Sequence, residues 1–549
     1  MKDSFRNTYS LFIESKKKFF ILLLLIFASI FEASGIALIY PLVAKFFNLT
    51  IENNIFFEKL IIVNNYYNFE NEKFFIILLL ISFLILKSIF LTYFRILLAR
   101  NSFDIIIRFR KKIFKSFFYV KYGYLQERLS SATNFFTHQS EIVGSAVTNQ
   151  FNIISNLIGI FFLFLLFAIF SFQIFLISFF FIIISAFLLK FLINFVRIIS
   201  KKLLISQQKY YLIINETLKN YQYLKISNSY SKLYFKFVKL LTDIKKNNIF
   251  FVFINRGTQS FSEPIIAFLI ILTFYIAIDY LNFNIALAGV LFIICSRLYS
   301  QVLKLFDNIQ SYKKDLVSYE HLNLFLSDFA NNVEQENGKE KFSLFDKIEV
   351  ENITFLQNKK IIFKNLSFLI NKNSLTLIKG RSGSGKTTLL NCLCGLLRVN
   401  SGIIKYDKKN INNINRNSLA NNAGYVLQEN FFFNGSVIDN LKFNNKHFDF
   451  PKVNNLAKIL DLKDIIDKNI IINESTSNLS IGEKQRLALI RELIRKPKLL
   501  ILDEVTSSID QNSTNAIVNY IKFLKKEITI VVVAHKNDFD ELADNTIQL

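Results

Sequence analysis

The sequence predicts a multidomain membrane protein in which an all-α transmembrane domain of six helices precedes an α/β domain. The chain has 549 residues, 52% of them hydrophobic, so it is too long for one ordinary domain and too apolar for a wholly soluble one. Long apolar segments dominate the first part, whereas short β-rich runs alternate with helical ones from about Asp346 onward. We therefore expect a transmembrane domain over 1–330, a linker over 331–345 and an α/β domain over 346–549.

Composition argues against two other classes of protein. The formal net charge is +24, yet Lys, Asn, Ile and Phe are frequent together while Gly, Pro and Trp are scarce, as an A/T-rich genome would produce. Much of the basic excess also falls in two loops between predicted spans, so we expect no nucleic-acid partner. Cys295, Cys392 and Cys394 have no zinc-like partner set, and we expect no disulfide.

Six apolar segments are candidates for membrane-spanning helices, which need roughly 20 residues. They are 19–40, 74–98, 151–170, 172–193, 265–278 with its flanks, and 285–306. Six spans place both termini on the same side. Because the loops 100–150 and 194–256 carry the lysines and arginines, the positive-inside rule makes them cytoplasmic. The α/β domain then faces the cytosol.

The segments around these spans also show helical patterns. The two basic loops predict paired cytosolic extensions of the spans, each ending in a short helix around 122–129 or 217–225; soluble hairpins are the alternative. The segment 54–69, between the first two spans, places Phe56, Phe57, Leu60 and Ile61 at helical spacing. This pattern suits a helix lying flat on the outer leaflet.

Three charged residues fall about a dozen residues into a predicted span, near the membrane midplane: Glu32, Lys87 and Arg297. Facing lipid, each would cost roughly 2.5 to 3.5 kcal/mol. We therefore expect them to face a water-filled cavity or one another. Two alternatives stay open, in which the side chains reach an interface or Glu32 and Lys87 simply pair as part of the structure.

A glycine-rich loop, GRSGSGKTT, indicates phosphate binding. It comprises Gly380, Arg381, Ser382, Gly383, Ser384, Gly385, Lys386, Thr387 and Thr388. In this pattern the backbone amides point at phosphates, Lys386 reaches the terminal phosphates and Thr387 holds magnesium. A predicted strand, 374–380, leads into the loop and a predicted helix, 387–397, follows it, so the phosphates would meet a helix N-terminus.

A second motif, LSIGEKQR at 479–486, resembles the signature sequence of ABC-type ATPases. With the phosphate loop and the apolar half, essentially the whole chain resembles ABC exporters of the six-span half-transporter type. The resemblance implies an ATPase that uses ATP and Mg²⁺. It also implies a head-to-tail dimer, in which Ser480 and Gly482 close over the phosphate of the other subunit's ATP. The partner would be a second copy or a homologous half-transporter.

The same resemblance assigns further roles in the ATPase half. The segment LLILDE, 499–504, matches the Walker B strand, so Asp503 would hold magnesium through water and Glu504 would polarise the attacking water. Gln428 matches the Q-loop glutamine, which touches the metal or that water, and His535 matches the switch histidine at the terminal phosphate. Asp510 closes the matching D-loop. Strand character is also expected at 348–355, 424–428 and 528–535.

Two positions depart from the family pattern. Ile481 replaces a glycine after Ser480 and puts a branched side chain where a backbone approaches phosphate. Gln357 aligns with the aromatic residue that stacks on adenine, which leaves Phe355 as a displaced candidate. We expect these changes to affect nucleotide affinity more than chemistry.

The segment FEASGIALIYPLV, 31–43, and the outer segment resemble those of bacterial flippases for lipid-linked oligosaccharides. Such substrates carry a pyrophosphate between an apolar tail and a sugar chain, and Lys87, Arg95 and Arg297, beside Glu32, would give it a basic path. The resemblance implies a bacterial plasma-membrane protein with a membrane lipid or lipid-linked glycan as substrate. Export of a peptide or hydrophobic small molecule, and a degenerate half that works only in a heterodimer, are the alternatives.

Overall fold

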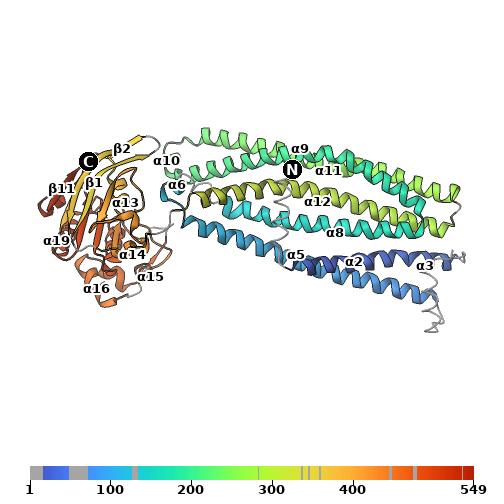
Figure 1. Cartoon of the computed structure of the whole chain (residues 1–549), viewed down its shortest axis with the longest axis horizontal. Coiled ribbons are helices and arrows are strands. Elements are labelled where there is room, and N and C mark those ends of the chain that lie inside the picture. The colour runs from blue at the N-terminus through green and yellow to red at the C-terminus, as the bar shows by residue number, and fades with distance from the viewer. Residues whose placement is uncertain are drawn as a thin grey trace. The chain divides into compact units, whose positions relative to one another are not determined.

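The computed structural model divides the chain into two units, which are described separately (Figure 1). The first is Met1–Val120 with Leu125–Asn332, and the second is Lys121–Tyr124 with Val333–Leu549. The residues that the structure describes are 17–47, 72–126, 134–281, 283–334, 338–343, 346–357, 360–443, 445, 448–473, 479–507, 509–534 and 536–549.

The described part of the first unit is helical. Its elements are α2 (Lys18–Ala37), α3 (Ile39–Phe46), α5 (Glu72–Phe117), the π-helix η1 (Phe135–Gln139), α8 (Ser140–Phe170), α9 (Phe172–Lys219), α10 (Tyr221–Ile226), α11 (Tyr230–Tyr275), the π-helix η2 (Ile276–Tyr280) and α12 (Ile285–Asn331). Helices α5, α9, α11 and α12 have 46 to 48 residues. At about 1.5 Å per residue they exceed the roughly 30 Å of a bilayer core. The predicted continuation of the spans as long helices is confirmed.

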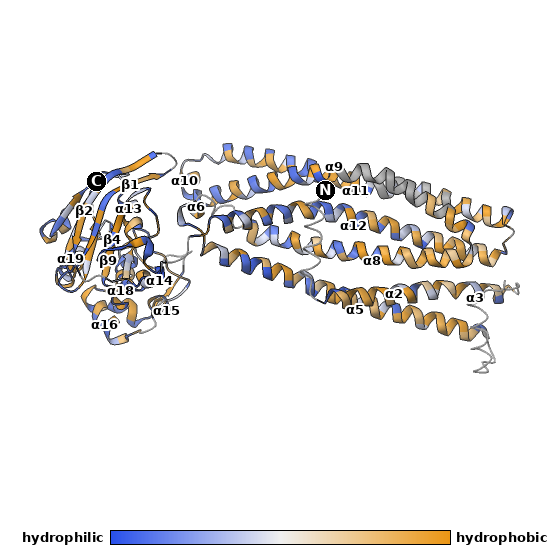
Figure 2. Ribbon diagram, viewed as in Figure 1, coloured by the Kyte–Doolittle hydropathy of each residue, from blue (hydrophilic) through white to orange (hydrophobic). Residues whose placement is uncertain are grey.

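Four helical stretches among the described residues are long and apolar enough to cross a membrane: Lys18–Phe46, Lys73–Phe117, Phe135–Phe170 and Ile285–Asn331. They contain the first, second, third and sixth predicted spans. Helices α9 and α11 run through the fourth and fifth, but several of their side chains are outside the described set, so these two spans stay predictions. The predicted outer segment, 54–69, also lies outside the described residues. Figure 2 shows how apolar residues concentrate along α2, α3 and the first part of α5.

The predicted short helices are present with shifted bounds. The first is α6 (Tyr122–Gln126), and the rest of its predicted range lies outside the described residues. The second is α10, which begins at Tyr221 because residues 217–219 still belong to α9.

Helices α8 and α12 pack against each other over most of their apolar length. Phe167, Leu291 and Val302 belong to one buried core with other residues of these helices. A polar contact also joins them, since Asp315 accepts hydrogen bonds from Ser145 Oγ at 2.7 Å and Asn149 Nδ2 at 2.9 Å. Asp315 is 9% exposed, so its two donors replace water in a buried setting.

The second unit contains a five-stranded parallel sheet, as the sequence predicts. The strand order is β11 (Asn545–Gln548), β3 (Leu375–Lys379), β10 (Thr529–Val533), β9 (Leu499–Asp503) and β6 (Ala423–Val426). All residues of β9 and β10 are buried, as in a parallel sheet covered on both faces. The carboxyl ends of β3, β9 and β6 lie at one edge, where ligands bind in such sheets.

A second sheet is antiparallel, in the order β2 (Lys360–Asn371), β1 (Lys347–Gln357), β4 (Ser401–Tyr406) and β5 (Lys409–Asn410). The strand predicted at 348–355 is β1, and it belongs to this antiparallel sheet. The short connection accounts for the pairing, because two residues between β1 and β2 suffice for an antiparallel pair but not for the crossover that parallel neighbours need.

A short strand pair, β7 (Gly435–Ser436) and β8 (Ile471–Ile472), and a set of helices complete the described part of the second unit. The helices are α13 (Lys386–Leu393), η3 (Ile411–Asn413), α14 (Arg416–Asn422), α15 (Val437–Lys442), α16 (Phe450–Ile459), α17 (Lys463–Asp467), α18 (Ile481–Ile494), α19 (Gln511–Leu524) and η4 (Asn537–Leu542). One core joins the parallel sheet to α15–α19, and another joins it to α13 and the antiparallel sheet. Tyr406 is fully buried in the second core, where its hydroxyl donates to the Leu393 carbonyl at 2.6 Å.

Replacing Tyr406 with Phe should destabilise the second unit by about 1–3 kcal/mol, because the buried Leu393 carbonyl loses its partner. For about 200 residues this corresponds to a fall in melting temperature of at least about 2 °C. Thermal unfolding of the purified full chain would show it. Tyr520→Phe, at a half-buried site on α19, is the control, and equal melting of the two variants would contradict the assigned role.

Candidate functional site

The glycine-rich loop connects β3 to α13 and takes a conformation that its glycines permit. Gly383 and Gly385 have φ angles of +80° and +97°, in the left-handed region that L side chains rarely adopt. Gly385 is the N-cap of α13. A Cβ at Gly380 would lie 2.7 Å from Ser384 Oγ. The loop therefore presents backbone amides and a helix N-terminus, which together attract anions.

Lys386 closes this loop from within. The residue is 6% exposed, and its Nζ donates to the carbonyls of Gly380 at 3.0 Å and Arg381 at 3.1 Å. The ammonium group is thereby held at the concave side of the loop. A triphosphate bound there would meet a positive charge in a preset position.

Thr387 and Asp503 form a pair of oxygen ligands suited to a divalent cation. Thr387 Oγ1 donates to Asp503 Oδ2 at 3.0 Å, and Asp503, the last residue of β9, is 1% exposed. Burial raises the pKa of Asp503, while the Thr387 hydrogen bond and the charge of Lys386 oppose this rise. Its second oxygen, Oδ1, is buried without a hydrogen-bond partner in the described structure. A hydroxyl and a buried carboxylate with a free oxygen fit Mg²⁺.

Glu504 and Gln428 lie together at the same edge of the sheet. Gln428 Nε2 donates to Glu504 Oε2 at 2.8 Å. The backbone of Glu504 has φ +55°, and its amide donates to the Val533 carbonyl at 3.0 Å. A left-handed conformation at a non-glycine residue costs about 1–3 kcal/mol. This turn places the Glu504 carboxylate beyond the strand end, where it could polarise a water molecule.

The signature segment forms the N-terminus of α18. Ser480 is the N-cap and shares a capping box with Glu483, since Ser480 Oγ accepts from Glu483 N at 3.2 Å and Ser480 N donates to Glu483 Oε2 at 2.6 Å. Ile481 is the first helical residue and is 64% exposed, so its side chain does not disturb the helix. Gly482 is buried. The action of Ser480 and Gly482 across a dimer stays a prediction.

The remaining predicted residues of the ATPase half have separate outcomes. Asp510 caps α19, with Oδ2 accepting from Ser513 N at 2.9 Å, and these hydrogen bonds lower its pKa. His535 lies outside the described residues. Phe355 is 7% exposed and its ring packs at 5.9 Å from that of Phe363. Its ring is therefore not available to stack on a base.

Sequence reasoning missed Tyr425, on β6 next to β9. Its hydroxyl donates to Asn391 Oδ1 of α13 at 3.4 Å. Burial raises the pKa of Tyr425, and the charge of Asp503 adds to this rise, so the phenol stays neutral beside the carboxylate. The sequence feature that could have indicated it is a tyrosine in a strand whose other residues are small or aliphatic.

The structure brings together two of the charges predicted in the membrane half. Lys87 Nζ lies 2.7 Å from Glu32 Oε1, joining α5 to α2 beside stacked Phe27 and Phe90. Arg95 on α5 and Arg297 on α12 are exposed, and neither forms an ion pair with an acidic side chain in the described part of the chain. Their placement on a substrate path stays a prediction.

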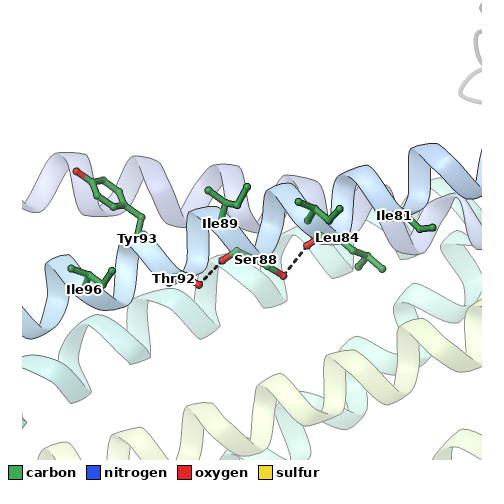
Figure 3. A pocket seen from close by; sticks show the side chains of 8 residues that line it. Ile81, Leu84, Ser88, Ile89, Thr92, Tyr93 and Ile96 are labelled. Atoms are coloured by element: carbon green, nitrogen blue, oxygen red, sulfur yellow. Dashed lines mark hydrogen bonds between the residues drawn. The ribbon is translucent and has the colours of Figure 1, made fainter.

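An open groove of about 630 Å³ lies along one face of α5 (Figure 3). It is lined by Ile81, Leu84, Ile85, Ser88, Ile89, Thr92, Tyr93 and Ile96. The two hydroxyls are already used, since Ser88 donates to Leu84 O at 2.8 Å and Thr92 to Ser88 O at 2.7 Å. The groove is therefore apolar in character.

Comparison with known families gives two matches. The model described as ABC transporter transmembrane region matches residues 19–302, and the model described as ABC transporter matches 363–507. Among solved structures, a bacterial Atm1-family ABC exporter with ATP bound is similar with a TM-score of 0.79, and the match covers 96% of this chain and 93% of that one, at 17% identity. That similarity concerns the fold.

Curated proteins match over shorter stretches. An ATP-dependent lipid A-core flippase of Pasteurella multocida is 33% identical over 208 residues, 36% of each chain. A Lactococcus lactis protein for lactococcin-G processing and transport is 34% identical over 215 residues, 38% of this chain and 30% of its own. A Haemophilus influenzae ABC transporter ATP-binding/permease protein is 29% identical over 278 residues, 49% of this chain and 50% of its own. The chain thus spans between 30% and 50% of the length of these three relatives.

Glu504→Gln should lower ATP hydrolysis at least about a hundredfold while Mg·ATP still binds, because only the group that polarises water is lost. Phosphate release and nucleotide binding by the purified full chain would be measured side by side. Glu527→Gln, at an exposed site after α19, is the control. Retained hydrolysis in the Glu504 variant would contradict the assignment.

Ile481→Gly should raise ATP turnover, because it removes a branched side chain from an exposed helix N-terminus. The gain should stay below about tenfold, since the backbone amide at 481 is kept. Steady-state turnover against Mg·ATP concentration measures it. A fall in turnover would show instead that the isoleucine contributes a useful contact.

Proposed function

Because this chain belongs to the ABC transporter family, whose transmembrane-region model matches just over half of it, we propose that it is an ATP-driven exporter that works as a dimer. Its substrate is a lipid-linked oligosaccharide or a related anionic lipid, which it moves from the cytoplasmic to the outer leaflet of a bacterial plasma membrane. The observation that carries the ATPase part is the joint placement of Thr387 against Asp503 and Gln428 against Glu504 at one edge of the sheet.

The ATPase residues divide the work between binding and reaction. The loop amides and Lys386 bind the phosphates. Thr387, Asp503 and Gln428 would hold Mg²⁺, which neutralises phosphate charge when bound. Glu504 accepts the proton of the attacking water or orients it, and Gln428 holds the Glu504 carboxylate in place through the 2.8 Å hydrogen bond. His535 contacts the terminal phosphate.

A second subunit completes the site. Ser480 and Gly482, at the N-terminus of α18, close over the phosphate bound by the other subunit, and Asp510 lies at that interface. The helix N-terminus favours an anion for the same reason as the phosphate loop does. Closing and opening this interface drives the membrane helices, with a second copy or a homologous half-transporter as the partner.

The charges and the groove on α5 support an anionic amphipathic substrate. Lys87 is held in place by Glu32, and Arg95 and Arg297 remain exposed without an acidic partner among the described residues. Because such cations are costly in lipid, an anionic headgroup is a suitable counter-charge. The apolar groove on the same helix suits a hydrocarbon tail. The similarity to lipid A-core flippases of Pasteurella multocida and Photobacterium profundum agrees with this class of substrate.

Export of a peptide is the second candidate, because the lactococcin-G transporter of Lactococcus lactis is equally similar. Stimulation of ATP turnover by a hydrophobic peptide but not by lipid would favour it. Turnover by the purified chain alone would indicate a homodimer. A requirement for a different polypeptide would indicate a heterodimer.

Neutralising Lys87 and Arg297 together, by Lys87→Gln and Arg297→Gln, should lower lipid-linked oligosaccharide translocation per ATP hydrolysed at least about tenfold, because the headgroup loses two charge-assisted contacts. Proteoliposomes with outward-facing detection of the glycan measure this ratio. Lys232→Gln, on the exposed surface of α11, is the control.

The double variant Glu32→Gln with Lys87→Gln distinguishes a role of Lys87 in contacting the substrate from a role in holding α2 against α5. If the pair only holds α2 against α5, the neutral pair should translocate normally. If Lys87 contacts the substrate, translocation should fall in this double variant by as much as it does in the single variant Lys87→Gln. Unchanged translocation in both double variants would overturn the proposed path.

A further inference from the structure

We propose that Tyr425 is a positioning residue of the ATPase site: its hydroxyl, anchored on α13 through Asn391, holds the Asp503 carboxylate in the orientation that a divalent cation needs. The inference rests on the proposed function, because it concerns the metal of the same ATPase site. It goes beyond that function in adding a residue that acts on the metal only through Asp503.

Strand pairing places Tyr425 and Asp503 on the same face of the parallel sheet. In the pair of β6 and β9, Tyr425 lies opposite Ile501, two residues before Asp503. Because side chains alternate along a strand, Ile501 and Asp503 point to one face, and Tyr425 beside Ile501 points to it as well. Helix α13 covers this face, since Ile501 and Leu390 share a buried core against which Tyr425 packs.

Helix α13 contacts both side chains in the same way. Thr387 and Asn391 are four residues apart in this helix, so they are neighbours on one side of it. Thr387 Oγ1 donates to Asp503 Oδ2 at 3.0 Å, and Asn391 Oδ1 accepts from the Tyr425 hydroxyl at 3.4 Å. Asn391 is 9% exposed, so its amide is anchored in the core. The helix therefore holds Asp503 and Tyr425 side by side.

Tyr425 is a neutral donor beside this buried carboxylate. Burial raises the pKa of Asp503, and hydrogen bonding with Thr387 and, more weakly, with Tyr425 opposes this rise. Burial also raises the pKa of Tyr425, so the phenol keeps its proton. Asp503 Oδ1 has no hydrogen bond of ordinary geometry in the described structure. Thr387 thus fixes one oxygen closely, while the weaker contact of Tyr425 steadies the carboxylate and leaves the other oxygen open to a metal.

The Asn391 amide lets the phenol adjust to the charge next to it. A phenol hydroxyl has one hydrogen to donate and can also accept. In the described arrangement that hydrogen points to Asn391; turning the amide over would make Asn391 the donor and release the hydrogen toward Asp503. Groups that orient a metal ligand in this manner matter, because their loss typically costs about 10- to 100-fold in metal affinity.

The first experiment measures metal binding by the full-length chain in lipid nanodiscs, with Glu504→Gln present so that ATP is not consumed. Mn²⁺ replaces Mg²⁺, because it suits the same oxygen ligands, and its binding at saturating ATP is followed by electron paramagnetic resonance. Tyr425→Phe should weaken Mn²⁺ binding at least about tenfold. ATP affinity in EDTA should stay unchanged. Tyr520→Phe, at a half-buried site on α19, is the control and should alter neither quantity.

The outcomes separate the inference from the proposed function. Equal Mn²⁺ affinity with and without the Tyr425 hydroxyl would overturn the inference and leave the ATPase function intact. Equal losses of Mn²⁺ affinity and of metal-free ATP affinity would also overturn it, because they would indicate a structural role only. Absence of Mn²⁺·ATP binding when Tyr425 is intact would instead refute the proposed function.

A second experiment tests orientation through ion selectivity. Mg²⁺ requires a near-ideal octahedral arrangement of ligands, whereas Ca²⁺ accepts variable geometry. Tyr425→Phe should therefore lower the ratio of Mg²⁺ to Ca²⁺ affinity by about fivefold or more. Displacement of bound Mn²⁺ by each ion measures the ratio. Equal weakening for both ions would contradict a positioning role.

A third experiment tests the anchor on α13. Asn391→Ala should weaken Mn²⁺ binding in the same direction as Tyr425→Phe but by less. The double variant should bind Mn²⁺ no more weakly than Tyr425→Phe alone, because Asn391 acts through the tyrosine. Additive losses would show that the two residues act separately and would overturn the proposed anchor.

Discussion

The hydrogen bond between Thr387 and Asp503 is the contact on which the organisation of the second unit depends. It joins the first turn of α13, the helix after the phosphate loop, to the end of β9, at 3.0 Å. A parallel sheet makes this possible because its strands all end at the same edge. Gln428 and Glu504 meet at that edge for the same reason. Two oxygen ligands, a positive charge and a carboxylate thus come together from segments more than 100 residues apart.

Much of this arrangement could be predicted because short motifs specify it locally. The glycine-rich motif predicts the phosphate loop, and in the structure Gly383 and Gly385 both have the positive φ angles that glycine permits. The five strands expected from β-rich runs are all present. The β2 strand and its antiparallel pairing were not predicted, since KNLSFLIN carries no strong alternation and register depends on the partner strand. Tyr425 was missed because its role depends on Asp503, a neighbour in space rather than in sequence.

The membrane half was predictable in outline but not in its contacts. Apolar length is sufficient to identify four of the predicted spans among the described residues. Which charges meet is decided by helix rotation and register, which composition does not fix. The pairing of Lys87 with Glu32 at 2.7 Å shows that these two side chains face one another, which is compatible with both a substrate path and a purely structural pair. Arg297 lies on a different helix and does not share in this pair, so its placement on a substrate path stays a prediction.

The contact of Asp315 with Ser145 and Asn149 has a consequence for motion. Sliding α8 along α12 would separate the Asp315 carboxylate from both donors, and a buried carboxyl group without hydrogen bonds is costly. We therefore expect the two helices to move together at this point, so that a displacement of one near Asp315 is passed on to the other.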